Sequence, residues 1–502
     1  MFMKYFYTFR TRLLAALAIL ALCSSCVIAI SGESLFGGHA EVPANSSVVV
    51  QASTSAKEST LFYWLSGTMY AIAPANDAWE SNQRWNIRRY DRALQQLDSF
   101  EFPVKYMEQP VSFFRCGERL LLLAEFREND SKKLTSRWFD ITAKPLSDET
   151  VLVSTILEGD DESQDKSSYT ILPSPDSTHF LVRNVSYKED ETREINIWAF
   201  NSRLELLQSK VVAIAKTKEL KTVQVDNTGA LYTVRSVEQG NLLVQRSLPG
   251  GSTLDISVPI SRLDTLEPNV GSAFLVPENE NVSYLFSIVR AGESVNMRKL
   301  LMHSCNWKTG KAEVMSNYVT DERVARKVVD DTVMGHFRLQ NVYSTPQGFI
   351  VWAELLADSL VKTYLRNTTI ETWMFYGGTT GLFAFDKKGT LLWQRGVLQK
   401  TLLGMRRNRE ATSHLSVVND TLCVLKYDAD AAYNANHMFS PRSHLVMSRI
   451  ALASGEAGAP VPVLAFIGSI RIPNDEIWCI DRKNLLIPCY EPDNSATRLM
   501  HL

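Results

Sequence analysis

The sequence predicts an all-β fold that repeats one structural unit, and three observations carry this prediction. From residue 47 onward the chain consists of short apolar runs separated by turn residues, a pattern that is typical of strands. Apolar residues seldom recur with the period of a helix in this part of the chain. Pairs of apolar runs joined by a short polar turn recur every 50 to 73 residues.

Each repeat begins with a hairpin made of two apolar runs. The first hairpin turns at Ser66 and Gly67, and the second turns at Cys116 and Gly117. Turns of six further copies lie at residues 173–177, 226–229, 277–281, 344–348, 419–420 and 473–475. These turns are rich in Gly, Pro, Asn, Asp and Ser, which tolerate the backbone dihedrals of a chain reversal. The sequence therefore holds eight copies of the unit.

Later strands of a unit follow the hairpin. They can be traced at residues 195–200 and 204–207, and outer hairpins turn at residues 306–311, 386–390 and 451–456. A repeat near 50 residues with about four strands per unit is typical of a β-propeller. The sequence thus predicts a propeller of about eight four-stranded blades. Seven blades is the alternative, if the hairpin at Ser66 and Gly67 belongs to the closing blade.

The last unit is short, because only 29 residues follow Pro473. Two or three strands fit into this length, so the final blade needs a strand from elsewhere. Residues 47–51 form an apolar run just before the first complete unit. We expect this N-terminal strand to complete the last blade and close the ring, because an open ring would leave sheet edges exposed.

Two segments resemble repeats of known propeller families. Residues 382–393, LFAFDKKGTLLW, are similar to a repeat of the quinoprotein-like propellers, which include outer-membrane assembly lipoproteins and quinone-dependent dehydrogenases. Residues 174–182, SPDSTHFLV, resemble the Ser-Pro-Asp-Gly turn of TolB-like and WD40-like propellers, with Ser177 in place of the glycine. Each resemblance covers about a dozen residues and implies the propeller architecture.

The N-terminus has the pattern of an export signal. Lys4, Arg10 and Arg12 precede the apolar run at residues 13–22, and small residues follow it. This run is too short to span a bilayer by itself. The pattern predicts a signal peptide over residues 1–25.

The end of this segment, Ser24-Ser25-Cys26, resembles a bacterial lipoprotein signal, although Cys23 stands where that pattern has an aliphatic residue. The resemblance implies cleavage before Cys26 and a lipid anchor on Cys26. A plain secretory signal without lipid and a retained helix that extends to Ile30 are the alternatives. The expected location is the bacterial cell envelope, as an outer-membrane lipoprotein facing the periplasm or the surface, with secretion as the alternative.

The chain downstream divides into a linker and one large domain. Residues 26–46 contain Ser31, Gly32, Gly37 and Gly38, a composition that favours a flexible tether. Residues 47–502 then form the propeller domain. With 45% hydrophobic and 10% aromatic residues the chain is globular. A formal net charge of −2 and the lack of an extended basic run argue against nucleic acid as a partner.

Five cysteines remain when Cys23 is removed with the signal and Cys26 carries lipid. Five is an odd number, so at least one thiol stays unpaired within the monomer. Cys479 and Cys489 flank a predicted turn at residues 481–484. They could form a disulfide if the strand register sets them opposite each other, and otherwise they are two separate thiols.

Catalytic and metal-binding motifs are missing from the sequence. The chain contains no Gly-x-Ser-x-Gly, His-Glu-x-x-His or Walker motif, and its eight histidines are scattered. Acidic loops at residues 160–165 and 428–436 lack the glycine of a calcium loop. We therefore assign no catalytic residue, no metal and no cofactor from the sequence.

A binding or scaffolding module that recognises a protein or a glycan is the function that this pattern favours. Two insertions lengthen the repeat, a predicted short helix at residues 321–329 and a basic loop at residues 400–409, and long loops on a rigid scaffold often bind partners. One alternative is a carbohydrate-active hydrolase or lyase centred on the channel, whose two carboxylates would come from different blades. An outer-membrane assembly factor is the second alternative.

Overall fold

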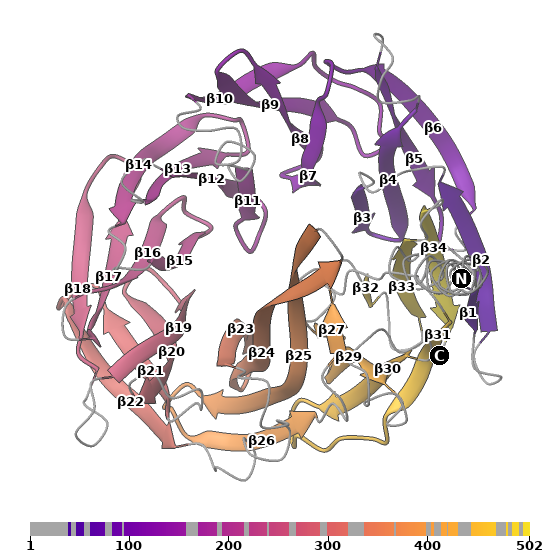
Figure 1. Cartoon of the computed structure of the whole chain (residues 1–502). Coiled ribbons are helices and arrows are strands. Elements are labelled where there is room, and N and C mark those ends of the chain that lie inside the picture. Colours follow the sequence, from indigo (N-terminus) through magenta and orange to yellow (C-terminus); the bar gives the residue numbers. More distant parts are fainter. Residues whose placement is uncertain are drawn as a thin grey trace, which may run out of the picture.

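The computed structural model shows a ring of β-sheets (Figure 1). It describes residues 39–41, 47–54, 61–75, 83–92, 95–156, 169–187, 193–214, 220–237, 240–260, 268–291, 299–319, 336–365, 368–397, 403–405, 413–418, 420–429, 443–467, 478–479, 484–490 and 495–501. Within these residues the secondary structure consists of strands, and no helix is long and apolar enough to cross a membrane.

The described strands form eight sheets, six with four strands and two with five. Blade 1 contains β3 (Leu61–Leu65), β4 (Thr68–Pro74), β5 (Arg84–Tyr90) and β6 (Gln96–Pro103), and blade 2 contains β7 (Gln109–Cys116), β8 (Arg119–Glu128), β9 (Ser131–Phe139) and β10 (Thr150–Ile156). Blade 3 contains β11 (Tyr169–Pro173), β12 (His179–Tyr187), β13 (Arg193–Asn201) and β14 (Leu206–Ile214), and blade 4 contains β15 (Leu220–Val225), β16 (Leu231–Ser236), β17 (Leu242–Ser247) and β18 (Thr253–Val258).

The second half of the ring is less regular. Blade 5 contains β19 (Pro268–Pro277), β20 (Val282–Ala291), β21 (Lys299–Asn306) and β22 (Lys311–Val319), and blade 6 contains β23 (His336–Thr345), β24 (Gly348–Leu365), β25 (Thr368–Asp386), β26 (Leu391–Val397) and β27 (Leu403–Met405). Blade 7 contains β28 (His414–Val418), β29 (Thr421–Ala429), β30 (Ser443–Ala451), β31 (Val461–Ile467) and β1 (His39–Glu41), and blade 8 contains β32 (Trp478–Cys479), β33 (Asn484–Tyr490), β34 (Ser495–His501) and β2 (Ser47–Thr54).

This arrangement confirms the predicted all-β propeller, with a sheet count that matches the prediction of about eight blades. Within a blade, strands that are consecutive in the chain are neighbours in the sheet, except β27, which pairs with β25. The first strand of a blade lies toward the centre of the ring and the fourth at the rim, as β11 and β14 show (Figure 1). Four-stranded sheets around a central axis are the defining feature of a propeller.

Alternating side chains of each strand build the core between neighbouring blades. On β16, Leu231 packs with Val212 between blades 3 and 4, whereas Tyr232 and Val234 pack between blades 4 and 5. This follows from the period of two along a strand, which sends successive side chains to opposite faces of the sheet. Both faces of an inner strand are therefore apolar, as the continuous apolar runs of the sequence suggested.

Turn chemistry fixes the hairpins. Asp176 accepts hydrogen bonds from the Thr178 amide at 3.0 Å and from the Ser174 hydroxyl at 2.7 Å. Ser177 has φ +57°, in the left-handed region that favours glycine. The residue that departs from the Ser-Pro-Asp-Gly pattern therefore still has the backbone conformation for which glycine is preferred.

Both N-terminal strands pair with the C-terminal part of the chain. β2 pairs antiparallel with β34, with Val48 opposite Met500 and Gln51 opposite Arg498. β1, which lies in the segment expected to be a tether, pairs with β31. Whether the β2 strand holds the ring closed is a question of stability and stays a prediction. Residues 1–25, which are expected to form a signal peptide, and Cys26 lie outside the described residues.

The cysteines differ in their surroundings. Cys116 and Cys305 are buried free thiols, and Cys423 is also buried. In the backbone register, Cys479 lies opposite Leu485, four positions along β33 from Cys489. Four residues of a strand span about 13 Å, and a disulfide needs Cα atoms within about 7 Å. Because Cys479 and Cys489 are not opposite each other in this register, we expect both thiols to react when the purified protein is titrated under denaturing, non-reducing conditions.

The predicted insertions have different outcomes. The helix expected at residues 321–329 lies outside the described residues. Within the basic segment 400–409, residues Leu403–Met405 form β27, which pairs with β25. Much of the extra length in this repeat lies in β24 and β25, which have 18 and 19 residues.

Candidate functional site

The most unusual element of the ring is the hairpin of β24 and β25, whose strands extend beyond the rest of the sheet of blade 6. β23 pairs with β24 only as far as Leu356, which lies opposite His336. The ladder between β24 and β25 continues from there to its last pair, Leu365 and Thr368. We call residues 357–376 the arm. Figure 1 shows the β24–β25 hairpin extending from blade 6 over the central part of the ring in this view.

Over most of their length, both long edges of the arm lack a neighbouring strand in the described part of the chain. From Ala357 to Leu365, β24 pairs with β25 alone. From Thr368 to Met374, β25 pairs with β24 alone, and β27 joins β25 at Phe375. Such edges present rows of backbone donors and acceptors on which a further strand can form.

A β-bulge marks the base of the arm. Glu354 lies opposite Thr380, but Leu356 lies opposite Gly377, so β25 carries one extra residue at this point. Bulges bend a strand and re-aim the side chains beside it. The bulge therefore sets the direction in which the arm leaves the blade.

A buried polar cluster occupies the same place. Glu354, Thr380, Ser413 and Lys426 are all at least 95% buried. The Oε1 atom of Glu354 accepts hydrogen bonds from the Ser413 amide at 2.8 Å, the Ser413 hydroxyl at 2.7 Å and the Thr380 hydroxyl at 3.4 Å. Lys426 on β29 donates to the Val397 carbonyl at 3.0 Å. The cluster thus links the base of the arm to blade 7.

Burial governs the electrostatics of this cluster. Desolvation raises the pKa of Glu354 to about 7, against the opposing effects of the Ser413 hydrogen bonds and the charge of Lys426. The Oε2 atom of Glu354 is buried and has no hydrogen-bond partner. Because the four side chains are enclosed, the cluster can hold the base of the arm and exchange a proton, but it offers no open surface to a substrate.

We expect the ionisation of Glu354 to make folding depend on pH. Between its ordinary value of 4.5 and about 7, Glu354 keeps its proton in the folded chain and loses it in the unfolded chain. Its contribution to stability therefore falls as the pH rises through this window, by about 1.4 kcal/mol for each unit of pKa difference. Glu354→Gln imitates the protonated carboxyl and should lose this dependence, measured as urea unfolding free energies from pH 4.5 to 7.5.

Comparing the unfolding free energies of wild type and Glu354→Gln at each pH separates the effect of Glu354 from the effects of other titrating groups. His303, whose pKa burial lowers to about 4, has the opposite effect, because only the unfolded chain binds its proton between pH 4 and 6.5. The contribution of His303 to the unfolding free energy is the same in wild type and in Glu354→Gln, so it cancels when one value is subtracted from the other. A constant difference between wild type and Glu354→Gln across the window would contradict the prediction.

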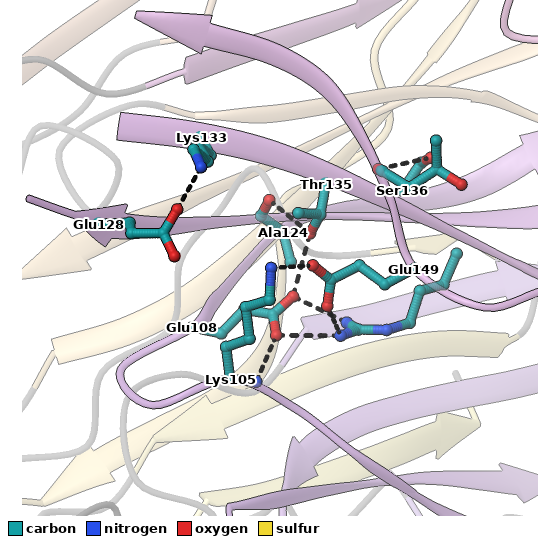
Figure 2. Close-up of polar contacts among 10 residues, drawn as sticks. Lys105, Glu108, Ala124, Glu128, Lys133, Thr135, Ser136 and Glu149 are labelled. Atoms are coloured by element: carbon teal, nitrogen blue, oxygen red, sulfur yellow. Dashed lines mark hydrogen bonds and ion pairs between the residues drawn. The ribbon is translucent and has the colours of Figure 1, made fainter. Parts of the chain in front are cut away.

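Another polar network lies at the junction of blades 1 and 2 (Figure 2). Arg137 on β9 forms a bidentate pair with Glu108, at 2.8 and 3.0 Å, and a second pair with Glu149 at 2.5 Å. Glu149 also pairs with Lys105 at 2.6 Å, and the Lys105 amide donates to Glu108 at 2.8 Å. Cations already pair with both carboxylates, so Glu108 and Glu149 do not resemble a pair of catalytic carboxylates. The network instead holds the β6–β7 connection against blade 2.

The sequence did not reveal the cluster around Glu354. Its one local signal is a single acidic residue inside the apolar run FIVWAELLA at residues 349–357. Of the predicted site residues, Cys26 lies outside the described part, and Cys479 and Cys489 are described only through their backbone pairing. Among the described residues, no group of three or more His, Cys, Asp or Glu side chains is placed to hold a metal ion.

No family model and no curated protein matches this chain. Solved structures with a similar fold include the WD40 domain of SCAP from fission yeast, at 7% identity over 92% of this chain and 98% of that chain with a TM-score of 0.37. They also include the β-propeller domain of Nup133 from Vanderwaltozyma polyspora, at 11% identity over 78% of this chain and 99% of that chain with a TM-score of 0.38. A polysaccharide lyase, Uly1, is similar at 10% identity over 88% of each chain, also with a TM-score of 0.38.

With TM-scores no higher than 0.38, these likenesses carry no argument about activity or partners. The protein's own sheet order defines its class, a β-propeller module, and the arm of blade 6 distinguishes it within that architecture.

Proposed function

We propose that the protein is a scaffolding module of the bacterial cell envelope that binds a protein partner through the arm of blade 6. The observation that supports this proposal is that no other described strand pairs with β24 from Ala357 to Leu365 or with β25 from Thr368 to Met374. A row of backbone N–H and C=O groups is complementary to an extended polypeptide, which can add as a further strand. A glycan has no such ladder, so the geometry favours a protein over a glycan.

The cell-envelope location in this proposal rests on the sequence pattern of the N-terminus. Residues 1–25 have the sequence of an export signal that ends before Cys26. A lipid on Cys26 would tether the ring to a membrane and leave the arm free to meet a soluble or membrane-bound partner.

Site-specific cross-linking tests the binding surface. A photoreactive amino acid would be placed at position 363 on the arm and, as a matched control, at the exposed position 154 on the rim strand β10. After irradiation of intact cells, we expect a defined protein adduct from position 363 and none from position 154. Equal adducts from both positions, or a glycan as the sole adduct, would refute the proposal.

A shortened arm provides the second test. Ala357 and Tyr376 are paired in the ladder, so residues 358–375 can be replaced by a two-residue Asn-Gly turn that suits a hairpin. This variant should keep its melting transition and lose the partner in a cross-linking pull-down from the native envelope. Retention of the partner by a folded short-arm variant would show that binding occurs elsewhere on the ring.

The anchor is tested separately. Cys26→Ala should release the protein from membranes or leave it uncleaved, because the acyl chains supply most of the membrane affinity. Fractionation of cells expressing wild type and Cys26→Ala measures this. Normal processing with equal membrane retention of the two proteins would contradict lipidation.

A further inference from the structure

A small cavity lies between blades 3 and 4, away from the arm. Its volume is about 100 Å³. Lys210 to Ala213 of β14 line it from blade 3, and Thr233, Arg235 and Gln245 line it from blade 4. A site between two blades is held by both sheets, which makes it more rigid than a site on a loop.

Strand register explains why polar groups meet here. Thr233 on β16 lies opposite Gln245 on β17, which lies opposite Asp255 on β18. Leu231, two residues before Thr233, packs with blade 3 residues. Because alternate residues share one face of a strand, Thr233 and Arg235 also face blade 3. Toward the rim, polar side chains therefore replace the apolar residues that pack between blades 3 and 4.

Positive charge exceeds negative charge at the cavity. Burial lowers the pKa of Lys210, the charge of Asp255 opposes that effect, and the charge of Arg235 lowers the pKa further. The two cations are therefore close enough to repel each other. Asp255 accepts a hydrogen bond from the Gln245 amide at 2.7 Å, and no ion pair of Lys210 or Arg235 is found among the described residues.

A third cation lies on the same face of blade 3. Arg183 is two residues beyond Leu181, which packs toward blade 4. Its Nε atom is buried without a hydrogen-bond partner, and burial lowers its pKa. Arg183, Lys210 and Arg235 thus face this interface with Asp255 as the acidic group next to Lys210.

We propose that the cavity between blades 3 and 4 binds one small oxyanion, a phosphate or sulfate group, free or at the end of a larger molecule. Lys210 and Arg235 supply the charge, and the Thr233 hydroxyl and the second N–H of the Gln245 amide supply further donors. A volume of about 100 Å³ holds roughly three waters, which is room for one tetrahedral anion. The anion would relieve the repulsion between the two cations.

Titration of the mature full-length chain with inorganic phosphate at low ionic strength tests this site. Calorimetry should show one saturable site in the wild type. Lys210→Met and Arg235→Gln should each weaken binding by about tenfold or more, since each removes a charged hydrogen bond. Lys308→Met, which removes an exposed lysine at a turn of blade 5, serves as the matched control and should leave binding unchanged.

Asp255→Asn provides a gain-of-binding test. Asparagine keeps the hydrogen bond from Gln245 and removes the competing negative charge, so phosphate should bind about two- to fivefold more tightly. Inorganic sulfate, glucose 6-phosphate and glucose 6-sulfate distinguish the sources, because a site for a free ion prefers the inorganic anions and a site for a larger ligand prefers the sugar esters. No saturable binding of any of these anions, or equal loss in Lys308→Met, would overturn the proposal.

Discussion

Replacing Glu108 with alanine should destabilise the domain by about 3 kcal/mol or more, the usual cost of breaking one side of a buried ion pair. The Glu108 side chain is fully buried and holds both guanidinium nitrogens of Arg137. It also accepts from the Thr135 hydroxyl at 3.0 Å and from the Lys105 amide. Alanine removes the bidentate acceptor of Arg137, which then keeps Glu149, and it removes the side-chain acceptor of the Lys105 amide.

Urea unfolding of Glu108→Ala measures this cost, and two variants control it. Glu118→Ala removes an exposed partner of Arg115 and should cost less than about 1 kcal/mol. The double variant Glu108→Met, Arg137→Met removes both charges of the bidentate pair and should recover much of the loss, because no guanidinium is then left buried without its bidentate partner. Equal effects of Glu108→Ala and Glu118→Ala would show that the network in Figure 2 adds little to stability.

Deleting residues 47–53 should lower the melting temperature of the whole domain. β2 forms a ladder with β34 from Ser47 to Thr54, and its loss removes several backbone hydrogen bonds at about 1 kcal/mol each, roughly 5 kcal/mol in total. It also exposes β34 as a new edge. If β2 closes the ring, calorimetry should show one cooperative transition at a lower temperature, since each blade is supported by its two neighbours.

A chain that lacks only residues 27–38 keeps both N-terminal strands and serves as the control. Adding a synthetic peptide of residues 47–54 to the truncated chain should restore part of the lost stability by strand addition. An unchanged transition after deletion of residues 47–53 would show that the ring closes without β2, within the C-terminal segment.

Much of the fold could be predicted because its signals are local. Turn residues such as Asp226 and Gly229 act within a few positions, the Asp226 carboxylate accepting from the Thr228 amide at 2.8 Å while Gly229 has φ +79°. Such turns and the apolar runs on either side of them recur in every copy of the predicted hairpin. Their spacing therefore predicted the strands, the four-stranded unit and the approximate number of blades.

The candidate sites could not be predicted, because they form between blades. Glu354 accepts a hydrogen bond from Ser413, which lies 59 residues later in the chain. Lys210 and Arg235 line one cavity from two different sheets. Register decides such contacts, and register is not visible in a single strand. For the same reason the position of Cys479 and Cys489 on either side of a predicted turn did not reveal that the backbone register sets Cys479 opposite Leu485.

The repeated unit and its turns depend on residues that are close together in the chain, so they could be read without a structure. The place where the arm leaves blade 6, the pairing of the buried charges and the cations at the cavity depend on contacts between distant segments. These contacts form when distant strands pair and facing sheets pack, which brings side chains from different blades together.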